Sequence, residues 1–179
     1  NIIVAHLGGG ITLSIHHHGK MVDIVSDDEG PFSPERAGRV SCRYLIDLCY
    51  SGQYDYHTMR KMLRGKGGLV DCLGTSSAIE VEARINKGDE NAKLVYEAMA
   101  YQIAKAIGEL ATVVDGEIDA IVLTGGIAYS KMLTGWIAKR VKFIAPVEIV
   151  AGENELESLA LGGLRVMRGE EQAHEYDLG

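Results

Sequence analysis

The amino-acid sequence predicts an α/β fold, a mixed five-stranded sheet with helices on both of its faces. The first observation is a set of three apolar strand patterns near the start of the chain, separated by short glycine turns. The second is the order of the later part, in which helical and strand patterns alternate and end on a helix. The core order is therefore βββαβαβα, with a helical insertion between the third strand and the longest helix.

Three consecutive strands are predicted at the start. Residues 2–7 begin with the apolar run Ile2-Ile3-Val4-Ala5 and lead into three glycines, which is typical of a buried strand. Residues 11–16 alternate Ile, Leu and Ile with Thr, Ser and His, the pattern of a half-buried strand. Residues 21–25 supply a third apolar strand after a turn at Gly19-Lys20. Short turns between successive strands predict an antiparallel meander.

Helices account for much of the remaining chain. Residues 27–41 are predicted to be a loop, because they contain Gly30, Pro31, Pro34 and Gly38. The longest helix is predicted over residues 91–114, where apolar residues recur at spacings of three and four. The other predicted elements are helices at about 42–51, about 56–64, from Ser76 or Ser77 to Asn86, about 129–140 and about 155–169, and strands at 118–123 and 147–150.

Composition excludes several classes of protein. The chain of 179 residues is 46% apolar and 24% charged, with a net charge of -7 and both signs interspersed. This balance argues against a nucleic-acid surface or a polybasic membrane patch, and no apolar run approaches the roughly 18 residues that cross a bilayer. The three cysteines lack a metal-ligand spacing, so we expect reduced, buried thiols in a cytoplasmic protein. Because a strand begins directly after Asn1, we expect a fragment or one lobe of a larger protein.

A glycine turn follows the first strand, in the segment His6-Leu7-Gly8-Gly9-Gly10. Glycines leave no Cβ to obstruct a ligand, so backbone N–H groups can approach phosphate oxygens, and His6 would add a side-chain donor. The alternative is a histidine at a strand end before an ordinary hairpin. Three successive glycines are more than a hairpin needs, so this segment is a candidate phosphate turn.

A second glycine turn, Gly125-Gly126-Ile127, lies between a predicted strand and a predicted helix. Free amides at a helix N-terminus suit the phosphates of a nucleotide. Turns of this kind also arise for steric reasons alone, so both interpretations stay open here.

The loop EGPFSPERAG contains Arg36 between stiffening prolines. A guanidinium held in a fixed place suits charge compensation at a phosphate or a carboxylate. The alternative is a surface arginine paired with a neighbouring acid.

Two further segments contain metal-binding residue types. Residues 16–18 are three histidines, but successive strand residues point to opposite faces, so no metal site is predicted there. Glu153, Glu155 and Glu157 begin the last predicted helix, where acidic residues favour the helix dipole in any case. One of these glutamates could orient a water molecule on magnesium.

Taken together, these segments resemble the acetate and butyrate kinase family. The matching segments occur in the family's order, and EGPFSPERAG, the most specific of them, is closer to the butyrate kinase branch. The resemblance implies an actin-like ATPase lobe with the ribonuclease H-like fold, which binds nucleotide in a cleft between two lobes. It also implies that this chain is the C-terminal lobe alone, without the family's N-terminal lobe. The segments are HLGGGITLSIHHHGKMVDI, EGPFSPERAG, GKGGLVDCLGT, IVLTGGIAYS and GENELESLALGGLRVMRGEEQAHEY.

The resemblance implies roles for individual residues. His6 would contact the phosphoryl group in transfer, and Arg36 would neutralise the phosphoryl and carboxylate charges. The implied reaction moves the γ-phosphoryl group of ATP reversibly to butyrate or a similar acid, with Mg²⁺, giving ADP and an acyl phosphate. Implied partners are the nucleotide, a small carboxylate and further copies of the chain. The family's remaining ligand positions match Gly8, Gly9 and Gly10 for phosphate, Gly74, Thr75, Gly125, Gly126 and Ile127 for nucleotide, and Glu153 or Glu155 for magnesium.

Two positions depart from the family pattern. Where the family reads LGT-x-D-x-R, this chain has Ser77 and Ile79 in place of the acid and the base that would hold the nucleotide. A second hypothesis therefore stays open, a non-catalytic homologue that binds a small acid or a protein partner. The presence of His6 and Arg36 favours the kinase.

Overall fold

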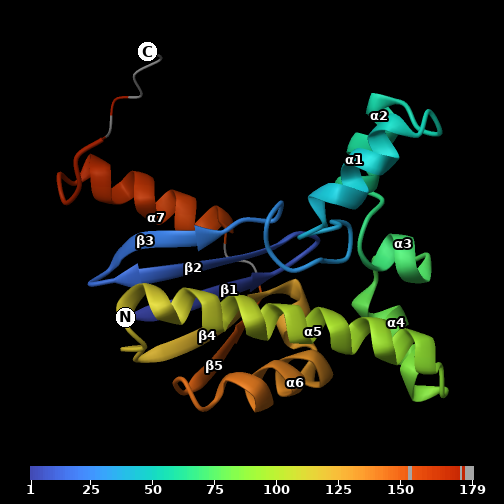
Figure 1. Ribbon diagram of the computed structural model, residues 1–179. Coiled ribbons are helices and arrows are strands. Elements are labelled where there is room, and N and C mark those ends of the chain that lie inside the picture. Colours follow the sequence, from blue (N-terminus) through green and yellow to red (C-terminus); the bar gives the residue numbers. More distant parts are fainter. Residues whose placement is uncertain (153–154, 174, 176–179) are drawn as a thin grey trace.

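A five-stranded mixed sheet forms the centre of the computed structural model, which describes residues 1–152, 155–173 and 175 (Figure 1). The strand order is β3-β2-β1-β4-β5. β1 pairs antiparallel with β2, and β2 pairs antiparallel with β3. On its other side β1 pairs parallel with β4, which pairs parallel with β5. The predicted mixed sheet is confirmed, and its strands are β1 (Ile2–Leu7), β2 (Ile11–His17), β3 (Lys20–Val25), β4 (Ala120–Gly125) and β5 (Val147–Ala151).

One face of the sheet is buried against two helices. In β1, Ile3, Ala5 and Leu7 are fully buried, whereas the residues between them face the other side of the sheet. The long helix α5 (Glu90–Ala111) and the helix α6 (Lys131–Val141) cover the buried face. The last helix, α7 (Glu155–Met167), lies on the opposite side of the sheet (Figure 1). Alternation along β1 therefore directs His6 away from the core.

Several element boundaries differ from the prediction. The long helix ends at Ala111 and continues as a short 3-10 turn, η1 (Thr112–Val114). The helix predicted from about 129 begins later, because η2 (Gly126–Tyr129) precedes it and the Ser130 side chain caps α6 by accepting from the Leu133 amide. The short helix α3 (Leu69–Leu73) was not predicted, since its five residues contain no full helical repeat.

The helical insertion extends beyond the sheet (Figure 1). It consists of α1 (Cys42–Tyr50), α2 (Tyr56–Leu63), α3 and α4 (Ala78–Asn86). No residue of α1 is buried. The prediction of buried cysteines is wrong, because Cys42 and Cys49 on α1 and Cys72 on α3 are free and exposed. Within the described residues, no helix is long and apolar enough to cross a membrane.

Two glycines allow the segment after α2 to pack directly on the loop that precedes α1. Gly68 has φ +64°, and a Cβ there would lie 1.8 Å from the Ser33 carbonyl oxygen. A Cβ at Gly67 would lie 2.5 Å from the Ala37 amide nitrogen. Leu69 N donates to the same Ser33 oxygen at 3.1 Å. The two segments therefore lie in backbone contact, which a larger residue would prevent.

We predict that Gly68→Ala lowers the free energy of unfolding by about 3 kcal/mol, because alanine is strained at this backbone conformation and clashes with Ser33. Urea unfolding measures the change. Gly108→Ala in α5 is the matched control, since a Cβ there meets no atom within 4 Å and alanine favours a helix by about 1 kcal/mol over glycine. Equal stability of the Gly68→Ala protein and the unmodified protein would contradict the packing.

Candidate active site

Three parallel strands end at one edge of the sheet. In register, Gly125 at the end of β4 pairs with Ala151 of β5, and Thr124 pairs with His6 of β1. Gly125 has φ +92°, and a Cβ at this residue would lie 2.5 Å from the Leu7 carbonyl oxygen. The first and second glycine turns therefore touch through their backbones. Ligands of open α/β sheets bind outside the carboxyl ends of parallel strands, which makes this edge the candidate site.

The first glycine turn is compact and lies against His6. Gly8 N donates to the Gly10 carbonyl oxygen at 3.1 Å. The Nε2 atom of His6 lies 3.0 Å from the point where a Cβ of Gly8 would be. The imidazole of His6 therefore borders the turn. A side chain at Gly8 would press against this imidazole.

The loop that contains Arg36 is fastened to the same turn. The Gly9 carbonyl oxygen accepts from Ser33 Oγ at 2.7 Å and from Glu35 N at 3.2 Å. Ser33 is fully buried. Arg36 Nε lies 3.7 Å from the point where a Cβ of Gly10 would be. The structure thus brings together His6, the first glycine turn and Arg36.

Arg36 has an acidic partner that sequence reasoning missed. Its Nε donates to Asp27 Oδ2 at 2.8 Å, and both side chains are 19% exposed. Arg64 Nη2 lies 3.5 Å from the same oxygen. The hydrogen bond from Arg36 is the main cause that lowers the pKa of Asp27, and the charge on Arg64 lowers it further, against the effect of burial. Arg36 is therefore paired with an acid, as in the alternative of a surface ion pair. Its side chain is nevertheless only 19% exposed and lies beside the first glycine turn.

The second glycine turn leads into the start of α6. Gly126 and Ile127 lie in η2, and Ser130 N donates to the Ile127 carbonyl oxygen at 2.9 Å. Gly125 also exchanges two backbone hydrogen bonds of 3.2 and 3.1 Å with Gly152. The predicted nucleotide turn is therefore held by the ends of two neighbouring strands.

The segment that contains Gly74 and Thr75 joins α3 to α4. Gly74 has φ +75° and ends α3, and Thr75 Oγ1 donates to Glu80 Oε2 at 2.7 Å. Ser77 caps α4 by accepting from the Glu80 amide. Ile79 is 84% exposed. At the two positions that depart from the family pattern, one side chain caps a helix and the other is an exposed apolar group.

A buried polar cluster ties α4 to the start of α6. The Tyr96 hydroxyl on α5 lies 3.3 Å from Glu82 Oε1 and 3.4 Å from Ser130 Oγ. Ser130 Oγ also donates to Glu82. Burial raises the pKa of Tyr96, so its hydroxyl stays protonated and can donate. This cluster joins α4, which follows Gly74 and Thr75, to Ser130, which follows the second glycine turn.

The predicted magnesium ligands fall at the edge of the described chain. Glu153 lies outside the described residues, and Glu155 begins α7 with a side chain that is not described. Among the described residues, no group of three His, Cys, Asp or Glu side chains could hold a metal ion. Magnesium at phosphoryl sites takes most of its ligands from phosphate and water, so one carboxylate here would suffice. The glutamate ligand stays a prediction.

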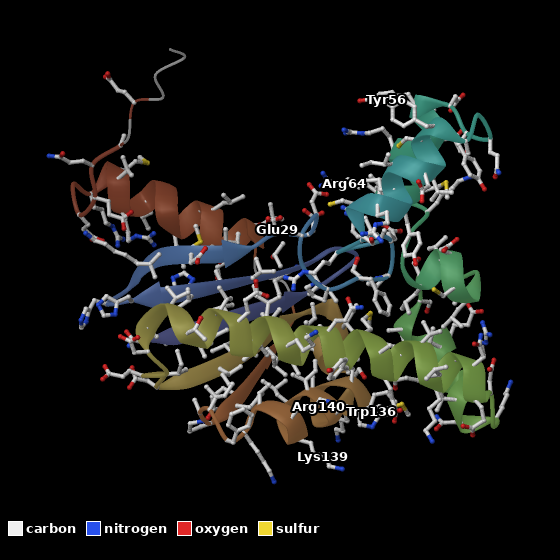
Figure 2. All side chains as sticks on the ribbon, in the orientation of Figure 1. Glu29, Tyr56, Arg64, Trp136, Lys139 and Arg140 are labelled. Carbon is white, nitrogen blue, oxygen red and sulfur yellow. The ribbon has the colours of Figure 1, made fainter. Side chains whose placement is uncertain are left out.

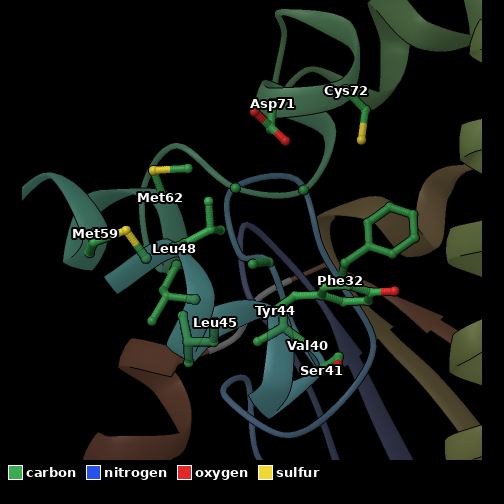
Figure 3. A pocket seen from close by; sticks show the side chains of 14 residues that line it. Phe32, Val40, Ser41, Tyr44, Leu45, Leu48, Met59, Met62, Asp71 and Cys72 are labelled. Atoms are coloured by element: carbon green, nitrogen blue, oxygen red, sulfur yellow. The ribbon is translucent and has the colours of Figure 1, made fainter. Parts of the chain in front are cut away.

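An apolar cavity of about 420 Å³ lies between the insertion helices and the Arg36 loop (Figure 3). Tyr44, Leu45, Met59 and Met62 line it together with Phe32. No Lys, Arg or His is among its lining residues. The cavity therefore offers no cationic side chain to a phosphate group, unlike the sheet edge beside Arg36.

Comparison with known proteins places this arrangement in a family. The sequence pattern of the acetokinase family matches residues 1–170. Porphyromonas gingivalis acetate kinase is similar at TM-score 0.81 and 22% identity, covering 91% of this chain and 49% of that chain. Entamoeba histolytica acetate kinase has the same TM-score of 0.81 at 21% identity, covering 91% and 51%. A propionate kinase from Francisella tularensis subsp. tularensis SCHU S4 has TM-score 0.79 at 23% identity, covering 87% and 47%.

The chain spans about half the length of these solved structures. At such identities the likeness shows a common fold, so the predicted mixed α/β fold is confirmed as one shared with these kinase structures. The narrower resemblance to the butyrate kinase branch stays a prediction. Because the family pattern matches nearly the whole sequence, this chain belongs to the acetokinase family.

Proposed function

We propose that this chain is the C-terminal lobe of a carboxylate kinase, which transfers the γ-phosphoryl group of ATP reversibly to butyrate or a similar short-chain acid. The contact between the two glycine turns, with His6 and Arg36 beside the first of them, is the observation that carries the proposal. Membership of the acetokinase family supports a carboxylate acceptor. The loop EGPFSPERAG supports the butyrate branch.

In the proposed reaction, an oxygen of the carboxylate forms a bond to the γ-phosphorus while the bond from that phosphorus to ADP breaks. The transition state spreads negative charge over three equatorial oxygens, so catalysis depends on positioning and on cationic groups. Arg36 Nε donates to Asp27, which fixes the plane of the guanidinium. The terminal nitrogens, of which Nη1 lies 4.0 Å from Glu35 Oε2, would contact the anion. The His6 ring can donate one hydrogen bond to the phosphoryl group whether neutral or protonated.

The proposed nucleotide site combines both glycine turns. Gly8, Gly9 and Gly10 would border the phosphates, and Gly125, Gly126 and Ile127 would border the adenosine, with Gly74 and Thr75 on the neighbouring wall. The fit is supported by the lack of Cβ atoms where the turns meet. Glu153 or Glu155 would hold magnesium together with phosphate oxygens. A bound Mg²⁺ would offset part of the phosphate charge.

A second candidate function is non-catalytic binding of a small acid or a protein partner. Ile79 favours it, because an exposed apolar side chain stands where the family pattern has a base. Ser77 likewise caps a helix instead of supplying a carboxylate. These changes affect nucleotide affinity and leave the groups around the first glycine turn intact.

The full-length protein, given ATP, Mg²⁺, butyrate and hydroxylamine, should form butyryl hydroxamate, because hydroxylamine traps an acyl phosphate. Removing a donor to the transition state costs about 100-fold or more, so His6→Ala and Arg36→Ala should reduce hydroxamate formation by that factor. Arg43→Ala is the control, since Arg43 is an exposed residue of α1. If acetate, propionate, butyrate and branched acids all give no hydroxamate with a folded protein, the non-catalytic function is favoured.

A further inference from the structure

Two arginines face each other next to the phosphate turn. Arg36 and Arg64 are partners in an isolated antiparallel bridge. Flanking backbone hydrogen bonds of 2.7 and 3.0 Å join the residues on either side of the two arginines. The arginines therefore occupy a non-hydrogen-bonded pair, the arrangement in which opposing side chains lie closest. Like charges placed directly opposite one another destabilise such a pair.

The backbone enforces this unfavourable pairing. Arg64 ends α2 in an extended conformation, and the glycines that follow it pack on the Arg36 loop. A Cβ at Gly68 would also lie 2.6 Å from the Arg36 carbonyl oxygen. The two segments thus meet at distances that only glycine allows, and this packing places the two arginines opposite one another.

One partly buried carboxylate, that of Asp27, lies close to both guanidinium groups. Asp27 Oδ2 lies 2.8 Å from Arg36 Nε and 3.5 Å from Arg64 Nη2. The nearest oxygen of Glu35 is 4.0 Å from Arg36 Nη1, and the Glu35 side chain is 44% exposed. Two guanidinium groups therefore share one close carboxylate, while the second carboxylate, that of Glu35, lies at the distance limit of an ion pair and is more exposed.

Of the two arginines, Arg64 is the more exposed to solvent. The Arg64 side chain is 57% exposed, against 19% for Arg36. Arg64 lies between the insertion helices and the loop that carries Glu29 (Figure 2). A Cβ on Gly10 would lie 3.5 Å from Asp27 Oδ2 and 3.7 Å from Arg36 Nε. Arg36 therefore lies next to the first glycine turn, and Arg64 reaches the same place through the Asp27 oxygen that both arginines approach.

We propose that Arg64 is a second anion-binding residue of the phosphate site and contacts, together with Arg36, the phosphate oxygens of ATP or of the acyl phosphate. Two guanidinium groups match a group with several charged oxygens better than they match a single carboxylate. This inference rests on the proposed function for the identity of the phosphate compound. The binding of a phosphate oxyanion at this place can be tested independently of it.

We predict that Asp27→Asn destabilises the protein in a pH-dependent way. The pKa of folded Asp27 lies below its ordinary value of 3.8, chiefly because Arg36 donates to it. An ionised Asp27 therefore stabilises the folded state above that value, and this contribution is lost as the pH falls through the lowered pKa. Urea unfolding at pH 7 should show a lower midpoint for the variant, and the difference should shrink in acid. A difference that grows in acid would contradict the ion pair.

The role of Arg64 is tested by calorimetric titration of the full-length protein with inorganic phosphate. Arg64→Ala should weaken phosphate binding about tenfold, the loss expected for one charge-assisted contact. Arg64→Lys should retain most of the affinity, because it keeps the charge. Arg60→Ala is the matched control, since Arg60 is an exposed residue of the same helix. A parallel titration with butyrate should show little change in Arg64→Ala.

Thermal unfolding checks that each variant is folded, and phosphate should raise the midpoint of the unmodified protein more than that of Arg64→Ala. Unchanged phosphate binding in Arg64→Ala, or a loss confined to butyrate, would overturn the assignment. If phosphate binding requires Arg64 but no acid yields hydroxamate, the proposed kinase function fails while the anion site stands. If hydroxamate forms and phosphate binding ignores Arg64, the kinase stands and this inference fails.

Discussion

The backbone contact between Leu7 and Gly125 is the constraint on which the candidate site depends. Parallel pairing of β1 with β4 makes both strands end at the same edge of the sheet. A side chain at Gly125 would lie 2.5 Å from the Leu7 oxygen, so the two turns can meet only if this residue is glycine. The meeting turns give one continuous backbone surface beside His6. A proposed phosphate site and a proposed nucleotide site thus share a single edge.

The charged groups of the site depend on a second backbone contact. The Arg36 loop is fastened to the first glycine turn through the Gly9 carbonyl oxygen and to the segment after α2 through Gly68. These attachments bring the backbone of both arginines close to Asp27, which their guanidinium groups then contact. Preorganised charges of this kind suit a reaction whose transition state concentrates negative charge. The cost is repulsion between the arginines, which an anionic ligand would relieve.

Much of the fold was predictable because it depends on local patterns. Alternation in β2, the apolar runs of β1 and β4 and the repeat of α5 each set one element, and the observed strands follow the prediction closely. Glycine clusters at the ends of β1 and β4 identified the two turns, since clustered glycines are recognisable in the sequence. The order of the matching segments indicated the acetokinase family, which the comparison confirmed.

The remaining features depend on contacts between distant segments. Asp27 gave no signal of its own in a loop of several acids, and Arg64 resembled an ordinary helix-end residue until the bridge to Arg36 was visible. The Glu82 cluster joins three helices, a relation that no local spacing encodes. Cysteine burial was mispredicted for a similar reason, because the insertion helices that carry the thiols extend away from the sheet. The magnesium glutamates fall at the edge of the described residues, so their roles stay predictions.

A calorimetric titration of the protein with ADP and Mg²⁺ tests most directly whether the edge formed by β1 and β4 binds nucleotide. The account predicts saturable binding at one site, because the two glycine turns are in place despite Ser77 and Ile79. Absence of saturable binding in a protein that unfolds cooperatively would contradict the account. Recovery of binding in a Ser77→Asp, Ile79→Arg variant would then assign the loss to those two residues and favour the non-catalytic function.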